Sequence, residues 1–236
     1  MAERPYTLLS CGMSLDGYLD DPSDERLVLS DDADLDRVDG VRADCDAILV
    51  GAATVRIDNP RLLVRDAARR EERIGRGLKP SPVKVTVTAR GLLDPHARFF
   101  TTGEAEKLVY CPTVAARALR PRLGGVATVV DGGGTVSMRR LAEDLHARGV
   151  RRLMVEGGGT IHTQFLTEDV ADELHLVVAP FFVGDSRARR FVDDGSFAFH
   201  PGRHAVLADV RRVGEVVLLR YALSDRFASD RLEEAP

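Results

Sequence analysis

Three consecutive glycines after a short apolar stretch are the strongest sign of binding chemistry in this sequence. Residues 152–155 read as a buried strand, and the pattern after residues 157–159 predicts a helix with Ile161, Phe165 and Leu166 on its buried face. Glycines let a ligand approach the backbone, and the first N–H groups and the dipole of a helix attract phosphate. A plain strand-to-helix turn is an equal alternative, because the pattern is neither Gly-x-Gly-x-x-Gly nor a P-loop.

Charged side chains gather at other predicted strand ends. Asp58 and Arg65 lie in residues 55–65, which follow the strand at 46–50 and hold a carboxylate, an amide and three arginines. Because Pro60 forbids a regular helix, we expect one shaped loop that carries both residues, with a bland surface loop as the alternative. Arg90 follows the strand at 83–88 and is a second candidate for binding phosphate, although such an arginine is more often only solvated.

The elements that must position these residues alternate along the chain. Apolar runs predict strands, helical spacing predicts helices, and near the end three strands follow one another with a hairpin between the last two. This order predicts an α/β fold with a mixed, mostly parallel central sheet, helices on both faces and an antiparallel C-terminal hairpin. The predicted strands are 6–11, 46–50, 83–88, 107–111, 127–130, 152–155, 173–180, 205–210 and 216–221, and the predicted helices are 31–43, 138–149 and the one after the glycines.

Composition limits the classes of function. With 236 residues, 44% of them apolar, the chain can form one large domain, whose core we place at residues 6–222 with a polar tail at 224–236. The net charge of −4 gives no basic field for nucleic acid. No apolar run approaches the ~18 residues of a membrane span, and the first residues do not resemble a signal peptide, so we expect a cytoplasmic protein. Residues 66–79 are so charged that we interpret them as a solvated excursion with some helix.

Several kinds of catalytic site are disfavoured by their missing motifs. There is no Gly-x-Ser-x-Gly elbow, no His-x-x-x-His pair and no zinc-deaminase arrangement. The cysteines at 11, 45 and 111 are odd in number and widely spaced, which favours buried thiols over disulfides or a metal site. His162 is the histidine nearest the glycines, and we interpret it as a surface residue or one behind the site.

Five motifs in this order resemble a known family, the reductase domain of bacterial riboflavin biosynthesis enzymes, which has a dihydrofolate-reductase-like fold. Each motif alone is weak, but their order and spacing over residues 6–222 are specific. The resemblance implies NADPH-dependent reduction of the ribosyl group of a 5-phosphoribosylaminopyrimidine to the ribityl form, in a standalone protein without the fused deaminase domain. The motifs are Gly-Met-Ser-Leu-Asp-Gly at 12–17, Asp-Ala-Ile-Leu-Val-Gly at 46–51 with Thr54, Asp-Asn-Pro-Arg-Leu-Leu-Val-Arg at 58–65, Val-Glu-Gly-Gly-Gly-Thr at 155–160, and Ala-Asp-Glu-Leu at 171–174 leading to Ala-Pro at 179–180.

The resemblance also implies residue roles. Asp58 and Glu156 stand at the reaction centre, Asp58 on the cofactor side and Glu156 toward the ribose hydroxyls of the substrate. An arginine pair suits the substrate 5′-phosphate. The implied cofactor residues are Gly12, Thr54, Asp58, Gly157, Gly158, Gly159 and Thr160, and the implied substrate residues are Arg42, Leu62, Arg65 and Glu156. Arg90 is our own addition to the cofactor site, because it would pair with the extra phosphate that distinguishes NADPH from NADH.

Departures from the family pattern keep alternatives open. The family commonly has a basic residue after Ser-Leu-Asp-Gly and later a Ser-x-Trp element, whereas this chain has residues 18–21 and 26–29, Tyr-Leu-Asp-Asp and Arg-Leu-Val-Leu. A dihydrofolate-reductase-like enzyme acting on a pterin or a secondary metabolite is one alternative, and a catalytically silent NADPH-binding regulatory protein is another. We expect no metal.

We also expect a homodimer. Residues 174–179 form a strand that is apolar on both faces, which is more than a solvent-facing edge strand should carry. The alternative is a central strand buried within one subunit.

Overall fold

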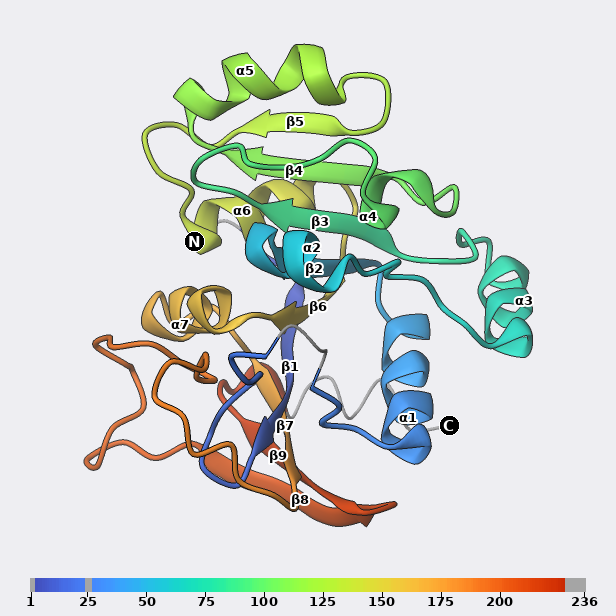
Figure 1. Cartoon of the computed structure of the whole chain (residues 1–236). Coiled ribbons are helices and arrows are strands. Elements are labelled where there is room, and N and C mark those ends of the chain that lie inside the picture. The colour runs from blue at the N-terminus through green and yellow to red at the C-terminus, as the bar shows by residue number, and fades with distance from the viewer. Residues whose placement is uncertain (1–2, 24–26, 228–236) are drawn as a thin grey trace. The chain divides into compact units, whose positions relative to one another are not determined.

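The computed structural model describes residues 3–23 and 27–227, which form seven helices and nine strands in an alternating α/β order (Figure 1). The strands are β1 (Tyr6–Ser14), β2 (Ala47–Gly51), β3 (Val83–Val87), β4 (Lys107–Cys111), β5 (Thr128–Asp131), β6 (Arg152–Gly157), β7 (Glu173–Ala179), β8 (Val206–Val213) and β9 (Val216–Ala222). The helices are α1 (Asp32–Ala43), α2 (Ala52–Asp58), α3 (Ala67–Gly75), α4 (Arg98–Thr101), α5 (Thr113–Leu123), α6 (Met138–Ala147) and α7 (Gly159–Thr167).

The chain divides into two compact units, each made of segments that are distant in sequence. Unit 1 comprises residues 3–5 and 38–154, and unit 2 comprises residues 6–37 and 155–227 of the described chain. Helix α1 and strand β6 each run from one unit into the other. The single domain expected from the sequence stays a prediction.

Unit 1 is built on four parallel strands in the order β5-β4-β3-β2, which lie side by side in Figure 1 with α5 along β5. All five residues of β2 are buried, as its continuous apolar sequence requires of a parallel strand covered on both faces. Its last residue, Gly51, pairs with Val87 at the end of β3, so these strands finish at the same edge. The surrounding core includes Phe99, Phe100, Val109, Leu119 and Leu123. The sequence did not predict α5, which contains Pro121.

Unit 2 carries the antiparallel part of the fold. Strand β7 pairs in parallel with β1 on one edge and antiparallel with β9 on the other, and β8 continues the sheet beyond β9. The two-residue turn at 214–215 joins β8 to β9, and Gly214 has φ of 56°, a conformation that suits glycine. These strands confirm the predicted mixed sheet with its C-terminal hairpin.

The three cysteine thiols, at positions 11, 45 and 111, are buried and unpaired. Among residues 3–23 and 27–227, no helix combines the length and the apolar character that crossing a bilayer needs.

Candidate active site

The glycine turn of unit 2 joins the end of β6 to the start of α7. Gly157 has φ of 100°, and a Cβ placed on it would lie 2.5 Å from Nε2 of His162. A Cβ on Gly159 would meet the carbonyl oxygen of Arg190. The packing of the protein therefore requires glycine at both positions. Packing alone can thus explain these glycines, as the alternative of a plain turn requires. The same glycines also keep side chains away from the start of α7.

The first turn of α7 keeps the features of an anion site. Its N-cap, Gly158, has no side chain that could cap the helix, and its carbonyl oxygen accepts the N–H groups of Ile161 and His162, so an anion at this turn would bind the N–H groups that precede Ile161. Thr160 is exposed, and its hydroxyl donates to Asp193 Oδ2 at 3.0 Å. The backbone N–H of Asp193 donates in turn to Thr163 Oγ1 at 2.8 Å. A phosphate that uses the Thr160 hydroxyl would therefore displace a carboxylate.

His162 is fully buried, so its interpretation as a surface residue is wrong. Its ring lies 5.4 Å from that of Phe191, centroid to centroid, and within the described chain neither ring nitrogen has a hydrogen-bond partner. Burial lowers the pKa of His162 to about 4, which keeps the imidazole neutral at physiological pH. The buried face of α7 is thus Ile161, His162 and Phe165, with Leu166 only partly covered.

Gly12 and Glu156 lie on the strands of unit 2. Gly12 is inside β1 and pairs with Val177, so the strand continues three residues beyond its predicted end at residue 11. The turn comes at Gly17, with φ of 88°, where Asp16 accepts hydrogen bonds from Ser14 Oγ and from the backbone N–H of residue 184. Glu156 is half-buried in β6, one residue before Gly157.

The segment that departs from the family pattern is turned inward at its first residue. Tyr18 is 6% exposed, and the guanidinium carbon of Arg190 lies 5.2 Å from the centre of its ring. Arg26 lies outside the described residues.

Thr54 and Asp58 lie on α2 of unit 1, so the prediction that Asp58 and Arg65 share one loop is wrong. The helix ends at Asp58, and Asn59 takes the left-handed conformation that stops it, with φ of 42°. Asn59 Oδ1 also accepts the backbone N–H of Arg98 at 2.7 Å. Thr54 is half-buried and Asp58 is exposed. Pro60 therefore lies two residues after the last residue of α2 and directly after its C-cap, Asn59.

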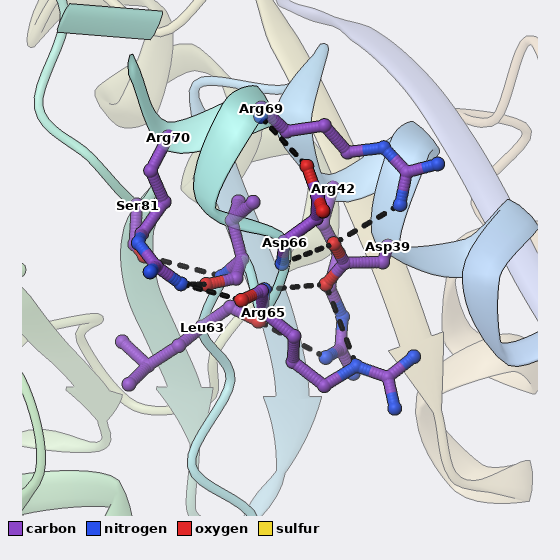
Figure 2. Close-up of polar contacts among 9 residues, drawn as sticks. Asp39, Arg42, Leu63, Arg65, Asp66, Arg69, Arg70 and Ser81 are labelled. Carbon is purple, nitrogen blue, oxygen red and sulfur yellow. Dashed lines mark hydrogen bonds and ion pairs between the residues drawn. The ribbon is translucent and has the colours of Figure 1, made fainter.

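Leu62 and Arg65 belong to the segment that follows α2, and Figure 2 shows Arg42 of α1 contacting this segment at Leu63. Nη1 of Arg42 donates to the carbonyl oxygen of Leu63 at 3.4 Å. Leu62 is 2% exposed and packs in the core of unit 1, with φ of 46°, an uncommon value for leucine. Arg65 has a side chain that is 47% exposed. Unit 1 thus brings the two predicted phosphate arginines to one segment, while Leu62 anchors that segment in the core.

Helix α3 lies within residues 66–79, where a solvated excursion with some helix was predicted, and Arg73 is the residue of this helix that departs from the prediction by being buried. Arg73 is 3% exposed, and Nη1 donates to the carbonyl oxygens of Ala43 and Cys45, at the end of α1. Burial lowers the pKa of its guanidinium. Arg70 donates to the carbonyl oxygens of Val64 and Arg65. The arginines of this helix hold the Arg65 segment and α1, which composition alone did not indicate.

Arg90 is exposed, three residues after the end of β3. Since β3 pairs with β2, which leads directly into α2, Arg90 and Thr54 follow neighbouring strand ends. Ligands of open α/β sheets collect at such ends. Among the described residues, no group of three or more His, Cys, Asp or Glu side chains could hold a metal ion.

A mostly parallel sheet, a glycine turn that opens a helix and an arginine-bearing segment define an α/β protein suited to phosphorylated ligands. Residues 5–219 match the model of the RibD C-terminal domain, and the chain belongs to this family. It is 36% identical, over 95% of its length and 99% of the relative's, to the 2,5-diamino-6-ribosylamino-4(3H)-pyrimidinone 5′-phosphate reductase of Archaeoglobus fulgidus. The reductase of the same name from Methanothermobacter thermautotrophicus is also 36% identical, over 80% of this chain and 84% of the relative.

Solved structures agree with this assignment. A pyrimidine reductase-like protein from Corynebacterium diphtheriae superimposes with a TM-score of 0.78, covers 92% of this chain and 91% of its own, and is 23% identical, which shows the fold. RibD of Acinetobacter baumannii is 25% identical with a TM-score of 0.73, and this chain spans 58% of its length. The predicted family, fold and reductase class are thereby confirmed. A reductase of this family uses a nicotinamide cofactor.

Proposed function

We propose that this protein reduces the ribosyl group of 2,5-diamino-6-ribosylamino-4(3H)-pyrimidinone 5′-phosphate to the ribityl form, with NADPH as the reductant, in riboflavin biosynthesis. The observation that carries the proposal is the match to the Archaeoglobus fulgidus reductase, since it extends over 99% of that relative. The names of the relatives favour the pyrimidine that still carries its second amino group over the deaminated form.

NADPH supplies the hydride, and the residues of the chain bind and orient the cofactor and the substrate. The start of α7 suits a cofactor phosphate, because its glycines keep side chains away from the N-terminus of the helix. Arg90, exposed after β3, is the proposed partner of the additional phosphate of NADPH. Asp58, at the exposed end of α2, is proposed to face the nicotinamide half of the cofactor, with Thr54 and Gly12 as further cofactor contacts.

The substrate roles follow the same reasoning. Arg42 and Arg65 are proposed to bind the 5′-phosphate, because both guanidinium groups lie at one segment of unit 1. Glu156, half-buried in β6, is proposed to accept hydrogen bonds from the ribose hydroxyls. Binding energy from the phosphate would hold C1′ of the open-chain imine in place for hydride transfer.

A spectrophotometric assay tests the proposal. Purified protein should consume NADPH with the diaminopyrimidinone ribosyl phosphate, more slowly with its deaminated form, and not with dihydrofolate. Faster turnover of dihydrofolate would favour the pterin alternative. Tight NADPH binding without turnover of any of the three would favour a regulatory protein.

We also propose a homodimer, formed through β8 rather than β7. Strand β7 is paired on both edges, and its buried Glu173 accepts a hydrogen bond from Arg220 of β9 at 2.9 Å, as suits a central strand. Strand β8 ends the sheet of unit 2 and exposes Val206, Leu207 and Val210. Light scattering at micromolar concentration should give twice the chain mass, and a monomeric mass would contradict the proposal. The cytoplasmic location stays a prediction.

A further inference from the structure

Asp39 is a buried carboxylate beneath the arginine-bearing segment of unit 1, and no role for it follows from the motifs. It lies in α1, one helical turn before Arg42, and is 1% exposed. Its Oδ1 accepts the backbone N–H of Arg65 at 2.7 Å, and its Oδ2 accepts that of Asp66 at 3.1 Å (Figure 2). Nη1 of Arg69 donates to Oδ2 at 3.2 Å. The carboxylate is therefore bound on both oxygens by groups that are 26 to 30 residues away in sequence.

These bonds fix the charge on Asp39. Burial opposes ionisation of the carboxyl, but the hydrogen bonds from the two backbone N–H groups and from Arg69 outweigh it and lower the pKa of Asp39. A buried carboxylate is costly unless it is paired, so the position of the segment and the ionisation of Asp39 depend on each other.

The segment carrying Arg65 is held from both sides. Helix α1 contacts it twice, through Asp39 at residues 65 and 66 and through Arg42 at the carbonyl oxygen of Leu63. From α3, Arg70 donates to the carbonyl oxygen of Val64 at 3.2 Å. The N–H of Val64 donates to Ser81 Oγ at 3.1 Å. These hydrogen bonds engage a backbone group of every residue from 63 to 66, so they restrict movement of the segment.

Asp39 also touches the Arg65 side chain. Oδ1 of Asp39 lies 3.5 Å from Nε of Arg65, and Figure 2 shows the end of that guanidinium pointing away from the carboxylate. A guanidinium held through Nε presents its two terminal nitrogens as a fork, the geometry that binds phosphate through two hydrogen bonds. The cluster as a whole stays positive, because four arginines at 42, 65, 69 and 70 outnumber the two aspartates at 39 and 66.

We propose that Asp39 is a positioning residue for phosphate recognition, which acts through Arg65 by fixing both its backbone and its Nε so that the terminal nitrogens meet the 5′-phosphate of the substrate. This inference rests on the proposed function, in which Arg65 binds that phosphate. The proposed role of Asp39 goes beyond stabilising the fold. It can be tested because it should affect binding of the phosphate and not of the rest of the substrate.

The experiment compares substrates with and without the phosphate. For Asp39→Ala and Asp39→Asn, KM and kcat are measured with the diaminopyrimidinone ribosyl phosphate and with its dephosphorylated form. We expect Asp39→Ala to raise KM about 10-fold for the phosphate, the loss of one charge-assisted contact, and to leave KM for the dephosphorylated form near that of the wild type. Asp39→Asn should lie between, because its amide keeps one oxygen for the Arg65 N–H. In an Arg65→Ala background, Asp39→Asn should add nothing further.

Controls separate this role from a structural one. Asp44→Ala is the matched variant, because Asp44 follows the same helix, has a 66% exposed side chain and lies 3.9 Å from Arg76. It should change neither KM. Equal increases of KM for both substrates, or an additive effect in the Arg65→Ala background, would mean that Asp39 only stabilises the fold. Calorimetric titration with ribose 5-phosphate repeats the comparison without turnover.

Failure of the proposed function would look different. If Arg65→Ala leaves both KM values and the affinity for ribose 5-phosphate unchanged, Arg65 does not bind phosphate. The proposed role of Arg65 and the positioning role of Asp39 are then both overturned. If Arg65→Ala weakens phosphate binding and the Asp39 variants do not, only the positioning role is overturned. Should Asp39→Ala fail to fold, Asp39→Asn carries the comparison.

Discussion

His162 should make the protein acid-sensitive in a definable pH range. Burial lowers the pKa of His162 from 6.5 to about 4. Between these values the unfolded chain binds a proton that the folded protein does not, so stability is fully present above about pH 6.5 and falls as the pH drops toward 4. At 1.36 kcal/mol per pKa unit, the free energy of unfolding loses about 3 kcal/mol across this range.

The test replaces His162 with leucine, which fits an apolar site and removes both unpartnered ring nitrogens. Urea denaturation at pH 7.5 and pH 4.5 should show that the variant loses about 2–3 kcal/mol less than the wild type between the two conditions. At pH 7.5 the variant should be at least as stable, because an unsatisfied buried polar group costs about 1–3 kcal/mol.

The matched control is His96→Leu, since His96 is exposed. It should leave the pH dependence unchanged. An equal loss of stability in the wild type and in His162→Leu would refute the reasoning, because it would show that His162 does not titrate differently in the folded and unfolded protein.

Three further predictions concern the proposed ligands. Gly157→Ala should weaken NADPH binding, measured by fluorescence titration, and destabilise the fold by about 1–3 kcal/mol, because φ of 100° and the nearby His162 ring both oppose a Cβ; unchanged binding and stability would contradict this. Arg65→Ala should raise KM with near-normal NADPH affinity, whereas Asp58→Ala should weaken NADPH binding or lower kcat; matching losses of NADPH affinity would rule out the division of roles. NADPH should be preferred over NADH about 10–150-fold, and Arg90→Ala should abolish the preference; equal efficiency with both cofactors in the wild type would disprove it.

Patterns among neighbouring residues correctly predicted the secondary structure around the glycine turn. The strand before the glycines and the helix after them depend on neighbouring residues, and both are present as β6 and α7. Helix α7, however, buries His162, which lies one helical turn before the expected Leu166 on the same side of the helix. The pattern treated His162 as polar, whereas its neutral ring is buried next to Gly157. A polar residue that packs as an apolar one cannot be found from periodicity alone.

Contacts between residues far apart in the chain could not be predicted from the sequence. Asp39 binds backbone groups 26 and 27 residues away, and nothing in its own neighbourhood distinguishes it from Asp36 or Asp44. Charge predicted solvent exposure for residues 66–79, which holds for most of α3 but not for Arg73. A guanidinium can be buried when carbonyl oxygens accept its N–H groups, as those at 43, 45 and 79 do for Arg73.

The arginines of unit 1 can therefore be sorted by what their guanidinium groups touch. Arg70 and Arg73 donate to backbone carbonyl oxygens, and a phosphate could recruit them only by breaking bonds that hold α1 and the segment after α2. Arg69 is tied to Asp39 through Nη1. Arg65 contacts Asp39 through Nε, which leaves the fork of the guanidinium directed outward in Figure 2. The arginine-rich stretch thus holds two candidate phosphate ligands, Arg42 and Arg65, with a scaffold around them, and a substitution in the scaffold should act on the ligand that it positions.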